Sequence, residues 1–173
     1  MQVPYRKPTK FSNIPMDPLM TEEKFADLQK QLASLKRRQP EAAREVARLA
    51  ELGDFSENVE YQMAKGRLRG INNAILRLEA QMNQAEIIRP STSGRVEVGN
   101  TVTVEVEGKT PSTSSGQVKT YQILGSSEVN PEKGIISYSS PIGAALLGKN
   151  VGESVSIILG NKKTVEYTIV QIN

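Results

Sequence analysis

The sequence contains no cysteine and no histidine, and it also lacks tryptophan. Without cysteine and histidine, the chain cannot form disulfide scaffolds, thiol nucleophiles, zinc fingers or histidine acid–base pairs. Any chemistry must come from carboxylates, lysine, arginine, tyrosine or hydroxyl groups, and magnesium is the kind of metal that oxygen ligands suit. Aromatic residues make up 5% of the chain and charged residues 24%, which indicates an elongated, solvated helical element rather than a deep globular enzyme.

Long apolar runs and a dominant charge are missing as well. No segment approaches the roughly 20 apolar residues of a membrane span, and residues 1–20 lack the apolar core of a signal peptide. The net charge is +3, but residues 20–88 carry eleven basic and eleven acidic side chains, which argues against a polycationic grip on nucleic acid. We therefore expect a cytoplasmic protein that makes no membrane contact.

The length of 173 residues and the hydrophobic content of 38% suit two modest domains better than one large core. Residues 1–19 contain four prolines and no periodicity, so we expect a flexible or merely docked leader. A helical pattern follows over residues 20–89, and a linker composition over 90–95. Residues 96–173 then form the second domain.

The helical segment consists of two apolar series that alternate steps of three and four residues, as in a heptad seam. The series mirror each other about residue 55, so that Leu32 pairs with Leu78 and every other pair is likewise centred on this point. This symmetry predicts an antiparallel helical hairpin with its turn at residues 53–56. The two series are Phe25, Leu28, Leu32, Leu35, Gln39, Ala42, Val46 and Leu49, then Tyr61, Ala64, Leu68, Ile71, Ile75, Leu78, Met82 and Ala85.

One level of this seam looks weak. Gln39 is its one polar residue, and Pro40 beside it removes a helical backbone hydrogen bond and should kink or bend the first helix.

The turn of the hairpin carries three acidic residues within seven positions, Asp54, Glu57 and Glu60. Asp54 and Glu57 are close enough to share a magnesium ion, which binds well to one or two protein carboxylates. An exposed pair of this kind holds a metal weakly unless a partner supplies further ligands. The alternative is that these charges only stabilise the start of the second helix through its dipole.

Basic residues gather on the half of the hairpin nearest this acidic turn. Arg37, Arg44 and Arg48 fall on roughly one face of the first helix, and such a stripe could follow a single-stranded nucleic acid backbone. The alternative is a solvated helix flank paired with Glu41, Glu45 and Glu51. The basic residues are Lys36, Arg37, Arg38, Arg44, Arg48, Lys65, Arg67 and Arg69.

The second domain changes to a period of two, which is typical of β-strands. Ser140 and Pro141 can cap and start one short helix that runs to Leu147 and ends at Gly148. We expect a small, mainly antiparallel sheet with this one helix. The strand residues are Val102, Val104, Val106, Tyr121, Ile123, Val155, Ile157, Val165, Tyr167 and Ile169.

Two phrases in the chain resemble those of the bacterial transcript cleavage factors of the GreA/GreB family. The first is Leu52-Gly-Asp-Phe-Ser-Glu-Asn-Val-Glu-Tyr-Gln62, followed by Lys65 and Arg67-Leu-Arg69. The second is Ser140-Pro-Ile142 with Ala145-Leu-Leu-Gly-Lys149 and Val151-Gly152. The resemblance spans about residues 20–173, and both phrases stand in the order of the family.

The resemblance implies a fold and a mechanism. It implies an α+β chain in which an antiparallel coiled-coil finger with an acidic tip at residues 53–60 precedes an FKBP-like β domain. That domain would dock on the rim of the RNA polymerase secondary channel, with Ser140, Pro141 and Ile142 as contacts. The tip would reach the active site, where Asp54 and Glu57 help hold a magnesium ion and its attacking water while the polymerase hydrolyses backtracked RNA.

In this interpretation Arg44, Arg48 and Lys65 contact the 3′ end of the nascent RNA. The factor would not be an enzyme by itself, would bind magnesium only in complex with the polymerase, and would be a monomer. An alternative from another class is a regulator that occupies the channel and inhibits transcription without promoting cleavage. A prolyl isomerase is a third possibility, but residues 95–173 offer only Tyr121, Tyr138 and Tyr167 as aromatics for a proline pocket.

Overall fold

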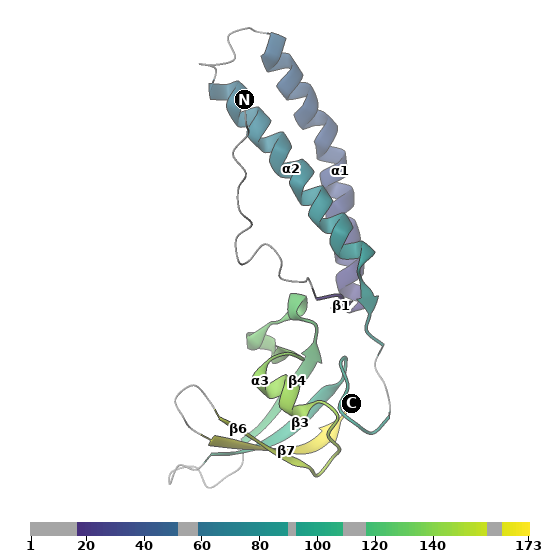
Figure 1. Cartoon of the computed structure of the whole chain (residues 1–173), viewed down its shortest axis with the longest axis vertical. Coiled ribbons are helices and arrows are strands. Elements are labelled where there is room, and N and C mark those ends of the chain that lie inside the picture. The colour runs from purple at the N-terminus through teal and green to yellow at the C-terminus, as the bar shows by residue number, and fades with distance from the viewer. Residues whose placement is uncertain (1–16, 52–58, 90–92, 109–116, 159–163) are drawn as a thin grey trace, which may run out of the picture.

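The computed structural model describes residues 17–51, 59–89, 93–108, 117–158 and 164–173. Two long helices form a finger, and a curled sheet with short helices forms a second domain at its base (Figure 1). The predicted α+β organisation is confirmed. The acidic turn at residues 52–58 lies outside the described residues, as does the Ser/Thr-rich segment 109–116.

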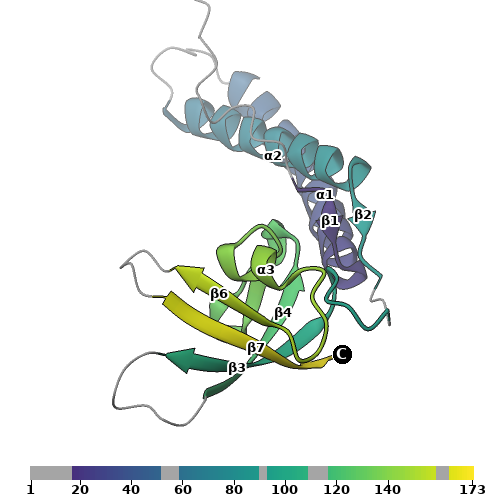
Figure 2. The same cartoon turned by 60° about the horizontal axis from the view of Figure 1, so that its bottom comes forward.

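The finger consists of α1 (Glu22–Glu51) and α2 (Val59–Asn83), which run antiparallel along each other in both views (Figures 1 and 2). The Thr21 hydroxyl accepts a hydrogen bond from the backbone N–H of Lys24 at 3.2 Å, so Thr21 is the N-cap that the sequence predicts. α1 continues through Pro40 to Glu51 as one helix. The finger is therefore a continuous two-helix rod.

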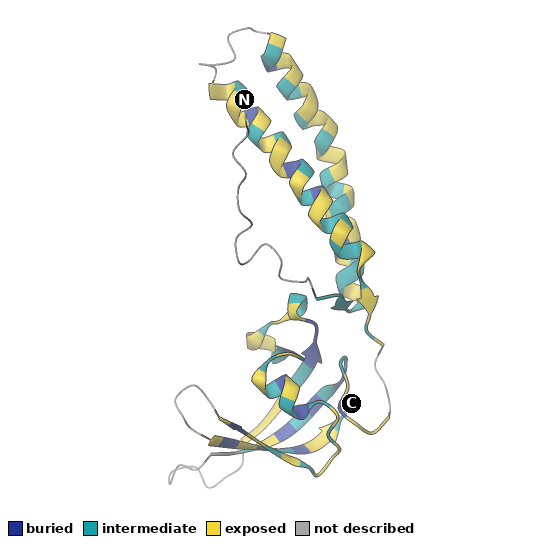
Figure 3. Cartoon of the chain, in the orientation of Figure 1, coloured by how far each residue is buried: buried dark blue, intermediate teal, exposed yellow. Residues whose placement is uncertain are grey.

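The predicted seam faces the neighbouring helix. All sixteen of its residues are buried or half-buried, whereas most other positions of the two helices are exposed (Figure 3). A hydrogen bond of 2.8 Å between Gln39 of α1 and Asn72 of α2 joins two positions that are nearly symmetric about residue 55. The seam and its register are thus confirmed.

The base of the finger holds an element that the sequence pattern did not predict. β1 (Leu19–Met20) pairs in parallel with β2 (Glu86–Ile87), and the side chain of Met20 is completely buried. The finger domain therefore begins before the predicted boundary at residue 20, because the last leader residues pair with the end of the hairpin. Two-residue strands leave no alternation in the sequence by which they could be recognised.

The second domain is a five-stranded sheet in the order β5-β4-β3-β7-β6. Its pairs are antiparallel except for β4 with β5, which run parallel, so the expected mainly antiparallel sheet is confirmed. The strands are β3 (Thr101–Gly108), β4 (Gln117–Leu124), β5 (Ile135–Ser137), β6 (Ser154–Ile158) and β7 (Thr164–Ile172).

Three short helices complete the part of the domain that the structure describes. The 3-10 helices η1 (Ser126–Glu128) and η2 (Pro131–Lys133) connect β4 to β5, and α3 (Pro141–Leu146) follows β5. α3 is the short helix that the sequence predicts after Ser140, although it ends at Leu146, one residue before the predicted end. The sequence did not predict η1 and η2.

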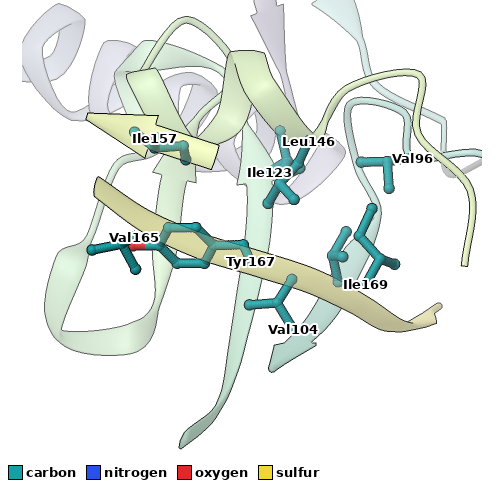
Figure 4. Close-up of a cluster of buried hydrophobic side chains, with 9 residues drawn as sticks. Val96, Val104, Ile123, Leu146, Ile157, Val165, Tyr167 and Ile169 are labelled. Carbon is teal, nitrogen blue, oxygen red and sulfur yellow. The ribbon is translucent and has the colours of Figure 1, made fainter. Parts of the chain in front are cut away.

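The core of the domain lies between α3 and one face of the sheet (Figure 4). Val102 and Val104 of β3 are fully buried, and the residues of β7 that pair with them, Ile172 and Ile169, belong to the same core. Leu146 of α3 is also fully buried against this face. The alternation of period two therefore identified the inner face of the sheet correctly.

Candidate functional site

The helix ends Glu51 and Val59 lie at the end of the finger remote from the second domain (Figure 1). Residues 52–58 connect these two ends and carry Asp54 and Glu57, whose own placement is outside the described residues. Glu60, the third acidic residue of the turn, is exposed in the first turn of α2. The two helix ends that the acidic segment joins are therefore remote from the second domain (Figure 1).

An ion pair lies just below this end. Arg48 donates hydrogen bonds to Glu45 from Nε at 3.0 Å and from a terminal nitrogen at 2.9 Å. These bonds lower the pKa of Glu45, with a smaller contribution from Arg67, and they raise the pKa of Arg48. The basic stripe was expected either to contact nucleic acid or to pair with neighbouring glutamates. Arg48 shows the second of these arrangements.

Arg44 and Arg48 line one shallow groove where α1 and α2 meet. Four arginines surround this groove against two glutamates, so its wall is net positive. Arg37, which the helical spacing placed with Arg44, is not part of it. The charged residues of the groove are Arg38, Arg44, Arg48, Arg67, Glu41 and Glu45.

Lys65 lies elsewhere. It lines a second hollow together with Arg69 and Asn72, and its ammonium lies 5.8 Å from the centre of the Tyr61 ring. The structure therefore brings two of the three predicted RNA contacts together and places the third in a separate hollow. Arg67 lines the first groove but is not among the predicted RNA contacts. The mirror symmetry of the seam places it one residue from the position opposite Arg44.

The predicted docking residues form a rigid turn before α3. Ser140 caps the helix by accepting a hydrogen bond from the N–H of Gly143 at 3.0 Å, and its hydroxyl donates to the carbonyl of Ser137 at 2.7 Å. Pro141 is exposed, whereas Ile142 is half-buried against the core. A Cβ on Gly143 would come within 2.2 Å of the Ser137 carbonyl oxygen, so the turn also requires this glycine. Pro141 is therefore the most accessible of the three.

Across the described ranges, no group of three or more acidic side chains is placed to hold a metal ion. Within the same ranges, no helix is both long and apolar enough to span a membrane.

Comparison with known proteins identifies the family. A profile described as "Transcription elongation factor, N-terminal" matches residues 18–87, and one described as "Transcription elongation factor, GreA/GreB, C-term" matches residues 91–173. The chain belongs to the GreA/GreB family of transcription elongation factors. The two matches meet near residue 90, where the sequence predicted the linker between finger and second domain.

Two relatives named GreA agree with this assignment, and one solved structure is also similar to the chain. The transcription elongation factor GreA of Macrococcus caseolyticus is 38% identical over 157 residues, which cover 89% of this chain and 95% of that protein. GreA of Treponema pallidum (strain Nichols) is 38% identical over 136 residues, covering 78% and 80%. Among solved structures, GreA factor homolog 1 of Thermus thermophilus is 27% identical, with a TM-score of 0.39 over 89% of this chain and 97% of that chain. Membership in the GreA/GreB family implies an association with RNA polymerase.

Proposed function

We propose that this chain enters the secondary channel of bacterial RNA polymerase and stimulates the magnesium-dependent hydrolysis of backtracked nascent RNA. The supporting observation is the finger itself. The 30 residues of α1 at about 1.5 Å each make a rod about 45 Å long, and the segment with Asp54 and Glu57 joins the two helices at its far end. A narrow rod that ends in carboxylates suits delivery of these groups into a deep, confined site.

Asp54 and Glu57 are the residues that would hold magnesium. Their carboxylate oxygens are the donors that magnesium prefers, and two carboxylates leave coordination positions for a partner and for water. In such a site, magnesium lowers the pKa of a bound water and stabilises the charge that develops on the phosphate. Since the remaining ligands belong to the polymerase, the factor supplies part of a site and is not an enzyme alone.

The other predicted residues serve to orient the two macromolecules. Arg44 and Arg48 in the positive groove, and Lys65 in the neighbouring hollow, contact the 3′ end of the nascent RNA. Ser140, Pro141 and Ile142 contact the rim of the channel, with Pro141 as the exposed point of the turn. The factor acts in the cytoplasm as a monomer.

The test uses a stalled, backtracked elongation complex, incubated with the protein and magnesium while short 3′-terminal RNA fragments are followed. The protein should release such fragments, and Asp54→Asn or Glu57→Gln should slow release by at least about a hundredfold, since each 1.4 kcal/mol of lost stabilisation is about tenfold in rate. Raising magnesium should partly restore the variants. Glu51→Gln, which removes an exposed charge at the end of α1, is the matched control and should cleave normally.

If the parent protein slows elongation and never releases fragments, the proposal is wrong and the chain is a channel-occupying inhibitor. If both tip variants cleave like the parent, the carboxylates serve only the start of α2.

A further inference from the structure

The finger and the second domain are fastened to each other by residues outside the proposed tip and docking turn. The segment Asp17–Thr21, here called the strap, lies against the loop Gly125–Glu128, which includes η1. More than 100 residues of sequence separate the two segments. Their contact therefore belongs to the tertiary arrangement of the two domains.

Two carboxylates connect these segments in opposite directions. Asp17 of the strap accepts a hydrogen bond from the backbone N–H of Ser126 at 2.6 Å. Glu128 of the loop accepts one from the backbone N–H of Thr21 at 2.8 Å, and its other oxygen accepts the Thr21 hydroxyl. Because each acceptor is charged and each donor N–H is fixed in the backbone, the bonds are strong and directional. Together they hold the start of α1 in one orientation.

Gly125 allows the strap to approach this closely. A Cβ at this position would lie 2.0 Å from the carbonyl oxygen of Leu19, far inside van der Waals contact. The φ angle of Gly125 is −67°, which any residue can adopt. Glycine is therefore required here by the space between the two backbones and not by its conformational freedom.

The strap is hydrogen-bonded to the base of the finger. Pro18 and Met20 accept hydrogen bonds from the backbone N–H groups of Glu86 and Ile88, both at 2.8 Å, just after the end of α2. Thr21 caps α1 directly. The strap thus binds the bases of both helices, and whatever fixes the strap relative to the second domain also fixes the finger.

A small rotation at this base is greatly amplified at the tip. Over a rod about 45 Å long, a rotation of about 10° displaces the far end by about 8 Å. Displacements of about 1 Å at a reacting centre can already cost about a hundredfold in rate. If the strap could rotate freely against the second domain, docking of that domain on the polymerase would not be enough to place the tip at the reacting centre.

We propose that Asp17, Gly125 and Glu128 form an interdomain clasp that aims the finger, and that they are positioning residues for transcript cleavage. This inference rests on the proposed cleavage function. The three residues act through the direction of the finger and touch neither the RNA nor the metal. Their loss should therefore reduce the cleavage rate at saturation and leave the affinity for the polymerase intact.

The direct test measures the angle between the domains in the free protein. Because the chain has no cysteine, a spin label can be placed at one introduced cysteine on α1, Ala47→Cys, and another on the exposed sheet position Ser156→Cys. The parent should give one narrow distance distribution. Gly125→Ala and Glu128→Ala should broaden or shift it, whereas Glu128→Gln, which keeps one acceptor oxygen, should have a smaller effect.

Two matched controls accompany these variants. Gly70→Ala adds a Cβ that meets no atom within 4 Å apart from its chain neighbours and the backbone of its own helix. Glu132→Gln removes an exposed carboxylate in the neighbouring helix η2. Both should keep the narrow distribution. A distribution that stays narrow in Gly125→Ala and Glu128→Ala would overturn the clasp, whatever the protein does to the polymerase.

The functional test separates aiming from docking. With Gly125→Ala and Glu128→Ala, the cleavage rate at saturating factor should fall about tenfold or more, while the dissociation constant for the polymerase stays within about twofold. A parallel loss of affinity would place these residues in the docking surface and overturn the positioning role, as would unchanged cleavage in a variant whose distance distribution has broadened. If the parent itself fails to stimulate cleavage, both the proposed function and the positioning role are wrong. The distance measurement still decides whether the clasp exists.

Discussion

Gln39 of α1 donates a hydrogen bond from its Nε2 to the Oδ1 of Asn72 on α2, with a distance of 2.8 Å. Both side chains are half-buried, at the level where the apolar seam is interrupted. The polar residue that looked like the weakest point of the finger thus has a partner on the facing helix. A hydrogen-bonded pair at one level also disfavours other registers of the hairpin, as a buried polar residue does in coiled coils.

This pair is expected to be energetically coupled. Asn72→Ala should lower the free energy of unfolding by about 0.5–1.5 kcal/mol, the usual net value of such a hydrogen bond. In a Gln39→Ala background the same change should cost clearly less, because its partner is already missing. Urea unfolding of the parent, the two single variants and the double variant gives the coupling energy. Strictly additive changes in the free energy of unfolding would mean that the bond contributes nothing.

The finger was predictable because its information is local. Sixteen seam residues repeat with a period that only a helix shows, and their mirror symmetry about residue 55 is sufficient to define which residues of the two helices face each other. The strand alternation of Val102 and Val104 defined the inner face of the sheet in the same way. Such patterns recur often enough in a short stretch to be recognised.

The contacts between the domains were not predictable in this way. Asp17 and Glu128 are single polar residues in segments without periodicity, and each depends on a backbone N–H more than 100 residues distant. The need for glycine at position 125 likewise comes from the carbonyl oxygen of Leu19 and leaves no sign in the neighbouring sequence. The separation of Lys65 from Arg44 and Arg48 was not predicted, because helical spacing groups basic residues along one helix and does not show which groove they line.

Two adjacent residues of α2 should respond very differently to truncation. Ile75 is 7% exposed in the seam, whereas Leu76 beside it is 64% exposed. Ile75→Ala should therefore lower the free energy of unfolding by about 2–4 kcal/mol, through lost burial and an unfilled cavity. Leu76→Ala should change it by less than about 0.5 kcal/mol. Equal costs in thermal or urea unfolding would mean that the two side chains do not face opposite ways.

The phenol of Tyr138 should report on the strap. Burial raises the pKa of Tyr138 above its usual value of 10.0, and the nearby charge of Asp17 together with a hydrogen bond to it raises the pKa further. Removing this charge makes the phenolate easier to form, so Asp17→Asn should lower the pKa of Tyr138. The difference between ultraviolet titrations with and without Tyr138→Phe isolates this one tyrosine. The pKa of Tyr121, which burial and Tyr167 raise, should not move.

The last prediction concerns the positive groove and ranks its arginines. Arg48 is already neutralised by two hydrogen bonds to Glu45, whereas Arg44 has no ion pair among the residues that the structure describes. A cation without an ion-pair partner displaces more counterions when it binds a phosphate. For single-stranded nucleic acid, a plot of log affinity against log salt concentration falls with a slope of about 0.7 for each phosphate contact. Arg44→Gln should therefore weaken the salt dependence of RNA engagement more than Arg48→Gln.

The measurement is the factor concentration that gives half-maximal cleavage, determined over a range of salt. Glu45→Gln provides the decisive comparison, because it leaves the Arg48 side chain in place and removes the charge that neutralises it. This variant should bind RNA more tightly than the parent at low salt. Its affinity should also depend more steeply on salt, with the slope increased by up to about the value of one phosphate contact. Should Arg48→Gln instead match Arg44→Gln in every salt, the Glu45 pair must open on binding, and the groove would use both arginines equally.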